Sequence, residues 1–156
     1  FYRSGNISSE GKYINDLEDG QWIFYFDDGE LDEIGSYNNG LKDGLWGRFH
    51  KNGRLKQEEK YSLGKLFSVS SFFLLGGEEI LTDNFKNGTG LLIDYHDDGS
   101  IFSKSHYTNG LLNGLYEEYF SNGRKAKYGE FRDNFKIGEW YEFNKRGKLI
   151  NKINYD

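Results

Sequence analysis

The chain has 156 residues, with 20 lysines and arginines against 25 aspartates and glutamates, for a net charge of −5. An anionic membrane or a nucleic acid is therefore a poor default partner. The absence of cysteine excludes disulfides, thiolate nucleophiles and cysteine-bound metals. The mean hydropathy of −0.80 resembles that of a disordered chain. However, 18% aromatic residues and 21 glycines instead favour short strands joined by glycine turns.

Two classes of residue recur with the same period along the chain. One set of glycines, from Gly5 to Gly147, is spaced by 24, 24, 24, 22, 24 and 24 residues. A set of aromatic residues eight positions later, from Tyr13 to Tyr155, has the same spacings. Two markers that share one irregular period indicate an internal repeat, which we number from 1 to 24. A half unit at 1–13 precedes repeats 14–37, 38–61, 62–85, 86–107, 108–131 and 132–155.

Each repeat is expected to form one β-hairpin. In the first full repeat, strands are predicted at residues 21–26 and 30–37, with a tight turn at Asp28-Gly29. Aspartate or asparagine before glycine tolerates the positive φ angles of a primed turn. A looser connection, such as residues 39–44, would lead to the next repeat. The predicted fold is all-β, a single-layer elongated antiparallel meander in one sheet with almost no helix.

Aromatic residues are expected on both faces of this sheet, because positions 9 and 12 have opposite parity along a strand. Without a second layer, rings packed on rings and on glycines would have to form the core. Glycine at position 22 would leave room for a ring or let the sheet curl. The glycines at position 22 are Gly11, Gly35 and Gly129. The aromatic column at position 9, which we assign to structure rather than to ligand stacking, consists of Trp22, Trp46, Tyr116 and Trp140.

Negative charge is concentrated in repeat 14–37, which has eight acidic residues and no basic one. Repeats 38–61 and 132–155 each carry a net charge of +3. The acidic residues either keep the sheet soluble or form a landing patch that accelerates association with a basic protein. The candidate partner-binding acids are Asp27, Asp28, Glu30, Asp32 and Glu33.

No catalytic residue, metal site or cofactor is expected. A calcium loop around Gly29 is disfavoured, since Phe24 and Phe26 stand where acidic ligands belong and Gly35 replaces the final glutamate. No nucleophile elbow, phosphate-binding loop or zinc-binding helix motif occurs in the sequence. The histidines, expected as surface imidazoles on strands, are His50, His96 and His106.

Repeat 62–85 departs from the pattern. Ser68 and Ser70 replace the glycine of position 7 and the tryptophan of position 9, and the following repeat is two residues short. Either the array is degenerate here, or the sheet bends and exposes an apolar patch for a partner or a second copy. The candidate patch residues are Phe67, Phe72, Phe73, Leu74 and Leu75.

The repeat, loosely N-G-x-x-x-G-x-W-x-x-Y-x-x-N-G-x-L-x-x-x-x-x-Y, resembles the MORN repeat. Residues 39–61 and 109–131 follow this pattern best, whereas repeats 14–37 and 132–155 lack glycine at position 3. The pattern looks most like the bacterial variant found in YwqK-family antitoxins. The resemblance to MORN repeats implies a protein-interaction module, a lipid-contacting module or an appendage to an enzyme. The likeness to the antitoxins implies neutralisation of a toxin.

The expected function is a non-enzymatic protein-binding repeat module, an antitoxin or immunity-type protein that neutralises a partner such as a basic toxin. Two alternatives stay open: an exported or surface repeat protein that mediates adhesion or host contact, and a membrane-associated scaffold for anionic lipid, which the charge disfavours. Nucleic acid is not expected as a partner. An antitoxin would be cytoplasmic, and a signal peptide before Phe1 would make the protein exported. The chain opens in mid-strand, so we expect a trimmed chain whose first edge could pair with a partner or a second copy.

Overall fold

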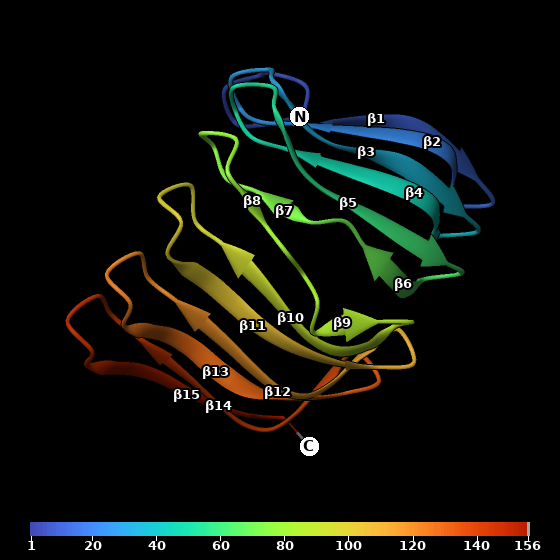
Figure 1. The fold of residues 1–156 in the computed structure, drawn as a ribbon. Helices are drawn as coiled ribbons and strands as arrows, with labels where there is room; N and C mark the ends of the chain where they lie inside the picture. Colours follow the sequence, from blue (N-terminus) through green and yellow to red (C-terminus); the bar gives the residue numbers. More distant parts are fainter. Residues whose placement is uncertain (156) are drawn as a thin grey trace. The chain divides into compact units, whose positions relative to one another are not determined.

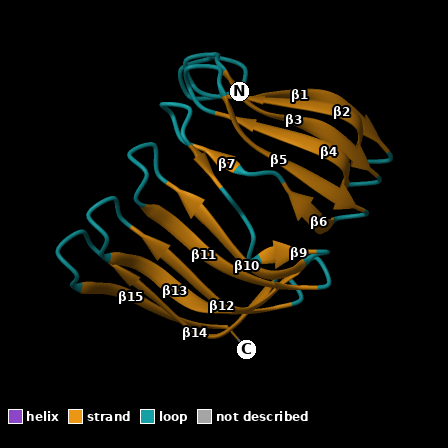
Figure 2. Cartoon of the chain, viewed as in Figure 1, coloured by secondary structure: helices purple, strands orange, loops and turns teal. Residues whose placement is uncertain are grey.

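The computed structural model describes residues 1–155, and all regular secondary structure in this range is β-strand (Figure 2). The chain divides into two compact halves, residues 1–81 and the residues from 82 onward, which are described separately. The strands of the N-terminal half are β1 (Ser9–Ile14), β2 (Leu17–Tyr25), β3 (Leu31–Asn38), β4 (Leu41–Phe49), β5 (Leu55–Ser62), β6 (Lys65–Val69), β7 (Phe72–Phe73) and β8 (Glu79–Ile80). Those of the C-terminal half are β9 (Phe85–Lys86), β10 (Thr89–Tyr95), β11 (Ile101–Thr108), β12 (Leu111–Tyr119), β13 (Lys125–Arg132), β14 (Phe135–Phe143) and β15 (Leu149–Tyr155).

Every strand pairs antiparallel with the strand next to it in the sequence, which confirms the predicted meander (Figure 1). The ladder is not one continuous sheet, however. It is divided into a six-stranded sheet, β1 to β6, a two-stranded sheet, β7 and β8, and a seven-stranded sheet, β9 to β15.

The first interruption lies in the repeat that departs from the pattern. The backbone N–H of Glu58 in β5 donates to the side-chain hydroxyl of Ser70 (2.9 Å), and Gln57 donates through its amide to the Ser70 carbonyl (3.1 Å). The Ser70 hydroxyl thus accepts the Glu58 N–H, which would be bonded to a backbone carbonyl if the neighbouring strand continued. Beyond Ser70 the chain leaves β5 and forms the separate β7–β8 hairpin.

The two kinds of turn are the reverse of the sequence prediction. The tight two-residue turn lies between repeats, where Asn39 and Gly40 have φ angles of 49° and 77° and Asn38 pairs with Leu41. At the turn within the repeat, only Gly29 has a positive φ, and its N–H donates to the Phe26 carbonyl (2.9 Å). A primed turn requires positive φ at both central residues, so the Asn-Gly pair between repeats is the one that meets it.

Glycine at position 7 lies inside a strand and forms a bulge there. Between the pairs Ile34–Gly47 and Ser36–Asp43, three residues of β4 stand opposite the single residue Gly35 of β3. Gly44, the first of the three, has a φ of 76°, which glycine adopts without steric cost. The first strand of the repeat is therefore longer than predicted, because it begins before this glycine rather than after it.

The core of each long sheet is a tryptophan packed on the bare backbone of a glycine. A Cβ atom added to Gly35 would lie 2.1 Å from the indole of Trp46. The Trp46 side chain is fully buried, and its indole N–H donates to the Ser36 carbonyl (3.0 Å). The same contact joins Gly11 to Trp22 and Gly129 to Trp140. This confirms that glycine at position 22 leaves room for a ring.

Tyrosines at position 24 complete the core by alternating with the tryptophans. In the N-terminal half their rings meet edge to face, with centroid distances of 4.9 to 6.5 Å. The order of this column is Tyr13, Trp22, Tyr37, Trp46 and Tyr61. Edge-to-face pairs are favoured by the ring quadrupole, so the column is stabilised beyond the area it buries.

Gly35→Ala is expected to destabilise the N-terminal half by about 1–3 kcal/mol, because the new methyl group would overlap a buried indole that has nowhere to move. Urea unfolding followed by tryptophan fluorescence measures the change. Ser36→Ala, on the exposed neighbour in the same strand, is the control and should change stability by less than about 0.5 kcal/mol. Equal effects of the two substitutions would contradict the tryptophan–glycine core.

Leu63→Asn is expected to stabilise the fold by about 1 kcal/mol. Leu63 occupies the tight turn before β6 with a φ of 46°, a conformation that is costly for leucine and tolerated by asparagine. Its side chain is 56% exposed, so little packing is lost. The urea midpoint should rise, whereas Leu81→Asn, at an exposed leucine without positive φ, should leave it unchanged. A gain at both positions would mean that removing an exposed leucine, rather than relieving the positive φ of the turn, stabilises the chain.

Candidate interaction surfaces

The acidic residues of repeat 14–37 are partly neutralised by the neighbouring repeat. Asp28 forms an ion pair with Lys51 (3.3 Å), and Glu33 forms one with Lys42 (2.5 Å). Asp27 accepts a hydrogen bond from the hydroxyl of Ser4. Asp27, Asp28 and Glu30 are exposed at the turn, whereas Asp32 and Glu33 are half-buried on β3. The strongest exposed negative charge is therefore at the turn rather than along the whole segment 27–33.

Asp32 differs from the other acids of this set. Burial raises the pKa of its carboxyl group, and the nearby cations Arg48 and Lys56 only partly oppose this effect. The ionised side chain is thus less favourable in the folded state than in the unfolded chain.

Asp32→Asn is expected to raise the urea midpoint near neutral pH. Because the folded pKa of Asp32 is raised, the wild-type chain regains stability as the pH falls and the carboxyl becomes protonated. The advantage of the variant should therefore shrink as the pH approaches 3.8, the ordinary value for aspartate. Urea titrations at pH 7, 5 and 3.5 check this. A gain that stays constant across the series would contradict it.

The apolar residues of repeat 62–85 are mostly covered. Phe72 is fully buried, so it does not belong to an exposed patch. Its ring lies 6.4 Å from His50, and Lys56 lies over it at 5.5 Å. Phe67 is 47% exposed. The remaining candidates, half-buried on or near β7, are Phe73, Leu74 and Leu75. A contact of Phe67 with a partner or a second copy stays a prediction.

The aromatic column at position 9 lies inside the fold. Trp22, Trp46 and Trp140 are almost completely buried, which places them where no ligand could stack on them. Tyr116 is half-buried, stacks on Trp140 with a centroid distance of 5.8 Å, and donates its hydroxyl to Glu118 (3.2 Å). Burial and the nearby Glu118 carboxylate raise the pKa of Tyr116.

Each histidine is bonded through a ring nitrogen to a backbone carbonyl. His106 is exposed on β11, as predicted, whereas His96 is half-buried and lies just after β10. The Nε2 atoms of His50 and His96 bond to the carbonyls of Phe73 and Tyr119, each at 2.8 Å, and Nδ1 of His106 bonds to the Leu115 carbonyl at 2.8 Å. His50 is buried, so its assignment as a surface imidazole was wrong. Among residues 1–155, no group of three or more histidine, aspartate or glutamate side chains is placed to hold a metal ion.

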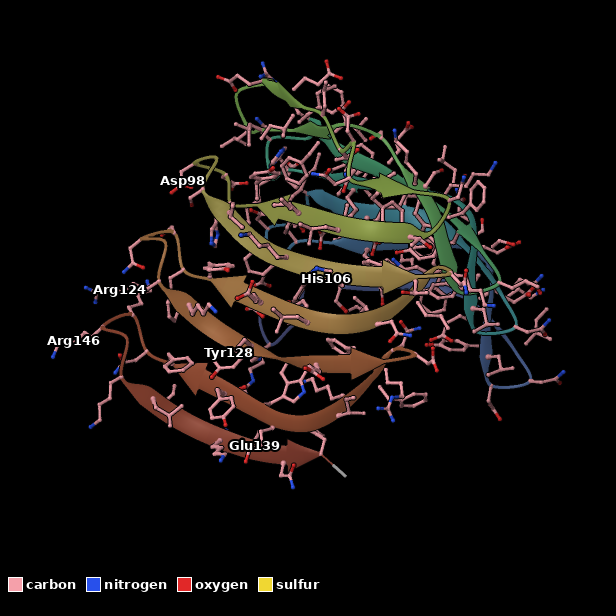
Figure 3. The ribbon with its side chains drawn as sticks, turned by 60° about the horizontal axis from the view of Figure 1, so that its bottom comes forward. Asp98, His106, Arg124, Tyr128, Glu139 and Arg146 are labelled. Carbon is pink, nitrogen blue, oxygen red and sulfur yellow. The ribbon has the colours of Figure 1, made fainter. Side chains whose placement is uncertain are left out.

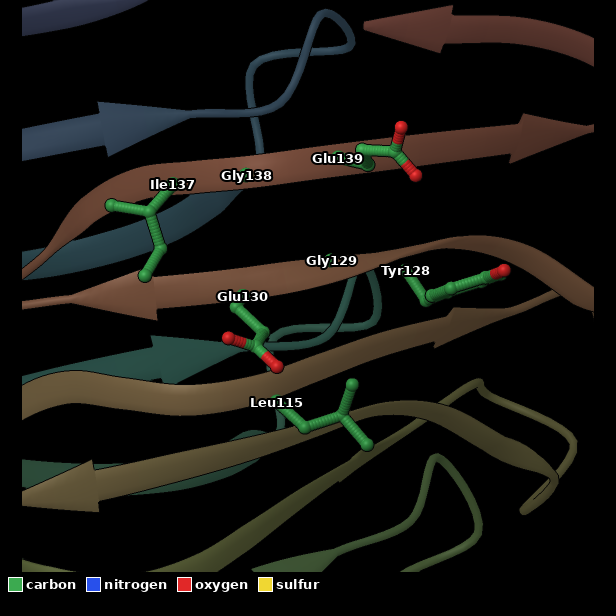
Figure 4. Close-up of a pocket in the computed structure, with 7 residues that line it drawn as sticks. All are labelled: Leu115, Tyr128, Gly129, Glu130, Ile137, Gly138 and Glu139. Atoms are coloured by element: carbon green, nitrogen blue, oxygen red, sulfur yellow. The ribbon is translucent and has the colours of Figure 1, made fainter. Parts of the chain in front are cut away.

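Two hollows on the sheet face opposite the tryptophans were not predicted from the sequence. In the C-terminal half a hollow of about 340 Å³ opens over β12, β13 and β14, where Tyr128, Glu130 and Glu139 line it (Figure 4). In the N-terminal half a hollow of about 250 Å³ opens at the same repeat positions, around Gly35 and Leu45. Each lies on the reverse side of a strand bulge. Because the hollows depend on that bulge, neither composition nor period indicates them.

Comparison with known protein families agrees with this architecture. A model of the MORN repeat variant matches residues 18–39 and 136–156. The match supports a MORN-repeat protein. The two matched segments correspond to the hairpins β2–β3 and β14–β15 rather than to the segments that follow the loose pattern most closely. No curated protein matches the chain. None of the described residues forms a helix that is long and apolar enough to cross a membrane.

Proposed function

We propose that this chain is a non-enzymatic, protein-binding MORN-type repeat protein that acts as an antitoxin or immunity-type protein. The observation that carries the proposal is an exposed leucine at the same repeat position in both halves, beside a hollow on the open sheet face. Leu45 is 60% exposed and Leu115 is 41% exposed. Apolar side chains surrounded by polar groups are suited to contact with another protein.

The histidine and tryptophan side chains, which could serve catalysis or ligand stacking, hold the fold together instead. One ring nitrogen of each histidine is bonded to a backbone carbonyl, and the three tryptophans are buried against glycines. The hollows are open to solvent, whereas an enzyme site encloses its substrate and excludes water. This arrangement favours binding of a macromolecule over chemistry on a small molecule.

The exposed acids of the N-terminal half favour a basic partner. Asp27 and Glu30 lie at the exposed turn after β2, and no ion pair joins either of them to another residue in the described part of the chain. Such charges accelerate the encounter with a positively charged protein and contribute less to the final affinity. A toxin that acts on nucleic acid would be basic. The resemblance to the bacterial MORN variant supports the antitoxin role.

Asp27→Asn with Glu30→Gln is expected to slow association with the partner severalfold at low salt, because steering depends on exposed charge. The partner would be isolated by pull-down from the native host with the full chain as bait, and association measured by surface plasmon resonance. Glu78→Gln with Glu79→Gln makes the same charge change at exposed positions beside and within β8 and is the control.

The outcomes of this experiment are distinct. Association that slows equally in both variants would assign the effect to net charge, and an unchanged rate would remove the turn acids from the interface. If no protein is retained by the bait, the protein-binding function is wrong. Growth rescue on co-expression with the isolated partner would support the antitoxin role specifically.

One observation favours a second candidate, binding to anionic lipid. Two adjacent turns of the C-terminal half carry exposed cations, and the guanidinium of Arg124 donates to the carbonyl of Lys145 (3.4 Å). Figure 3 shows Arg124 and Arg146 at the ends of these turns. Sedimentation with anionic vesicles that disappears in high salt, without capture of a protein, would favour this candidate.

A further inference from the structure

The hollow of the C-terminal half combines apolar walls with two carboxylates. Leu115 and Ile137 contribute the apolar side chains, and Glu130 and Glu139 contribute the charges (Figure 4). The hollow forms because β14 bulges opposite Gly129: the pairs Tyr128–Tyr141 and Glu130–Ile137 leave three residues of β14 facing that one glycine. Its volume of about 340 Å³ is large enough for one long side chain, and it is too small for a folded element.

The two carboxylates differ in their surroundings. Glu139 forms an ion pair with Lys152 (2.6 Å) and accepts a hydrogen bond from the hydroxyl of Tyr141. Glu130 is exposed, and its carboxylate has neither an ion pair nor a hydrogen bond with any other described residue. The hollow therefore carries one uncompensated negative charge beside an apolar wall.

Elsewhere the same fold repeatedly places a lysine ammonium between a carboxylate and an aromatic ring. The ammonium-to-carboxylate distances are 2.5 to 2.6 Å, and the ammonium lies 3.9 to 5.4 Å from the ring centroid. The three sets are Lys42 with Glu33 and Trp46, Lys125 with Glu117 and Tyr128, and Lys152 with Glu139 and Tyr141. Glu130 lies in a hollow lined by Tyr128, but no cation among residues 1–155 forms an ion pair with it.

We propose that this hollow receives an arginine side chain from an exposed segment of a partner protein, with Glu130 as its principal anchor. The inference rests on the proposed protein-binding function and names the chemistry of the partner. The methylenes of arginine would lie against Leu115 and Ile137, as long cationic side chains do on apolar surfaces. The guanidinium has five donors in one plane, so it can bind Glu130 while one edge reaches Glu139.

Arginine is favoured over lysine by the position of the charges. The ammonium of lysine is a compact, strongly hydrated point charge, whereas the guanidinium is weakly hydrated and bridges two acceptors. The corresponding hollow of the N-terminal half has Ser36 and Leu45 at the positions of Glu130 and Glu139, and its carboxylate, Glu58, comes from a different repeat position. The arginine site is therefore assigned to the C-terminal half alone.

The test is an NMR titration of the ¹⁵N-labelled full chain with a blocked pentapeptide that has one central arginine between glycines. The matched probe replaces arginine by citrulline, which keeps the shape and removes the charge. Arginine peptide should shift the amide signals of residues around the hollow, Leu115, Gly129, Glu130, Gly138 and Glu139. The citrulline peptide should bind about tenfold more weakly, since a hydrogen bond to a charged group is lost.

Variants make the assignment specific. Glu130→Gln should weaken binding of the arginine peptide about tenfold, whereas Glu79→Gln, the same charge change on β8, should leave it unchanged. Glu130→Lys should abolish binding, because the introduced ammonium would fill the hollow. Dispersed amide spectra of each variant verify that it is folded. Equal binding of the citrulline peptide, equal effects of both glutamine variants, or shifts centred on another surface would overturn the site.

Failure of this site and failure of the proposed function can be told apart. The titration needs no partner, so it tests the hollow independently of any pull-down. A captured partner whose affinity is unchanged by Glu130→Gln would overturn the arginine site and leave the protein-binding function standing. Arginine-peptide binding without any captured partner would overturn the function. A partner whose affinity falls about tenfold in Glu130→Gln, and on replacement of one of its own arginines, would support both.

Discussion

The packing of an indole ring on a glycine backbone is the contact on which the rest of this structure depends. A single-layer sheet has no second layer to bury its side chains, so its stability must come from within the strands. Trp46 solves this by covering the bare backbone of Gly35, and its indole N–H donates to the carbonyl of Ser36, the next residue on the neighbouring strand β3. The bulge at Gly44 supplies the extra residues that aim the ring at that glycine.

The same packing separates the two faces of each sheet by role. The tryptophans and the aromatic residues of position 24 lie on one face and form the core. On the opposite face a hollow lies over the same glycine and beside the bulge. The candidate binding surface thus accompanies the glycine and the bulge that position the tryptophan. A hollow recurs at equivalent positions in the two halves.

Ion pairs in this fold join neighbouring strands or turns, both within a repeat and between adjacent repeats. Counted by repeat, residues 14–37 are strongly acidic and residues 38–61 are basic. In the folded chain Asp28 and Glu33 meet Lys51 and Lys42 of the next repeat, so part of the imbalance disappears across the ladder. Asp27 and Glu30, at the turn after β2, stay exposed and form no ion pair with another described residue. A count of charges along the sequence overstates the exposed negative charge when the residues that form ion pairs lie in different repeats.

The period of 24 residues, together with the aromatic strand positions and the glycine turns, determined the all-β class, the antiparallel order of strands and the packing of rings on the glycines of position 22. It could do so because a fixed period fixes strand register, and register fixes which residues become neighbours. The tertiary structure decided what depends on single hydrogen bonds and local twist. It placed the tight turn between the repeats, ended the first long sheet at the hydroxyl of Ser70, and buried Phe72 and His50. It also left Glu130 at a hollow without a cation, since only the folded bulge shows which side chains meet there.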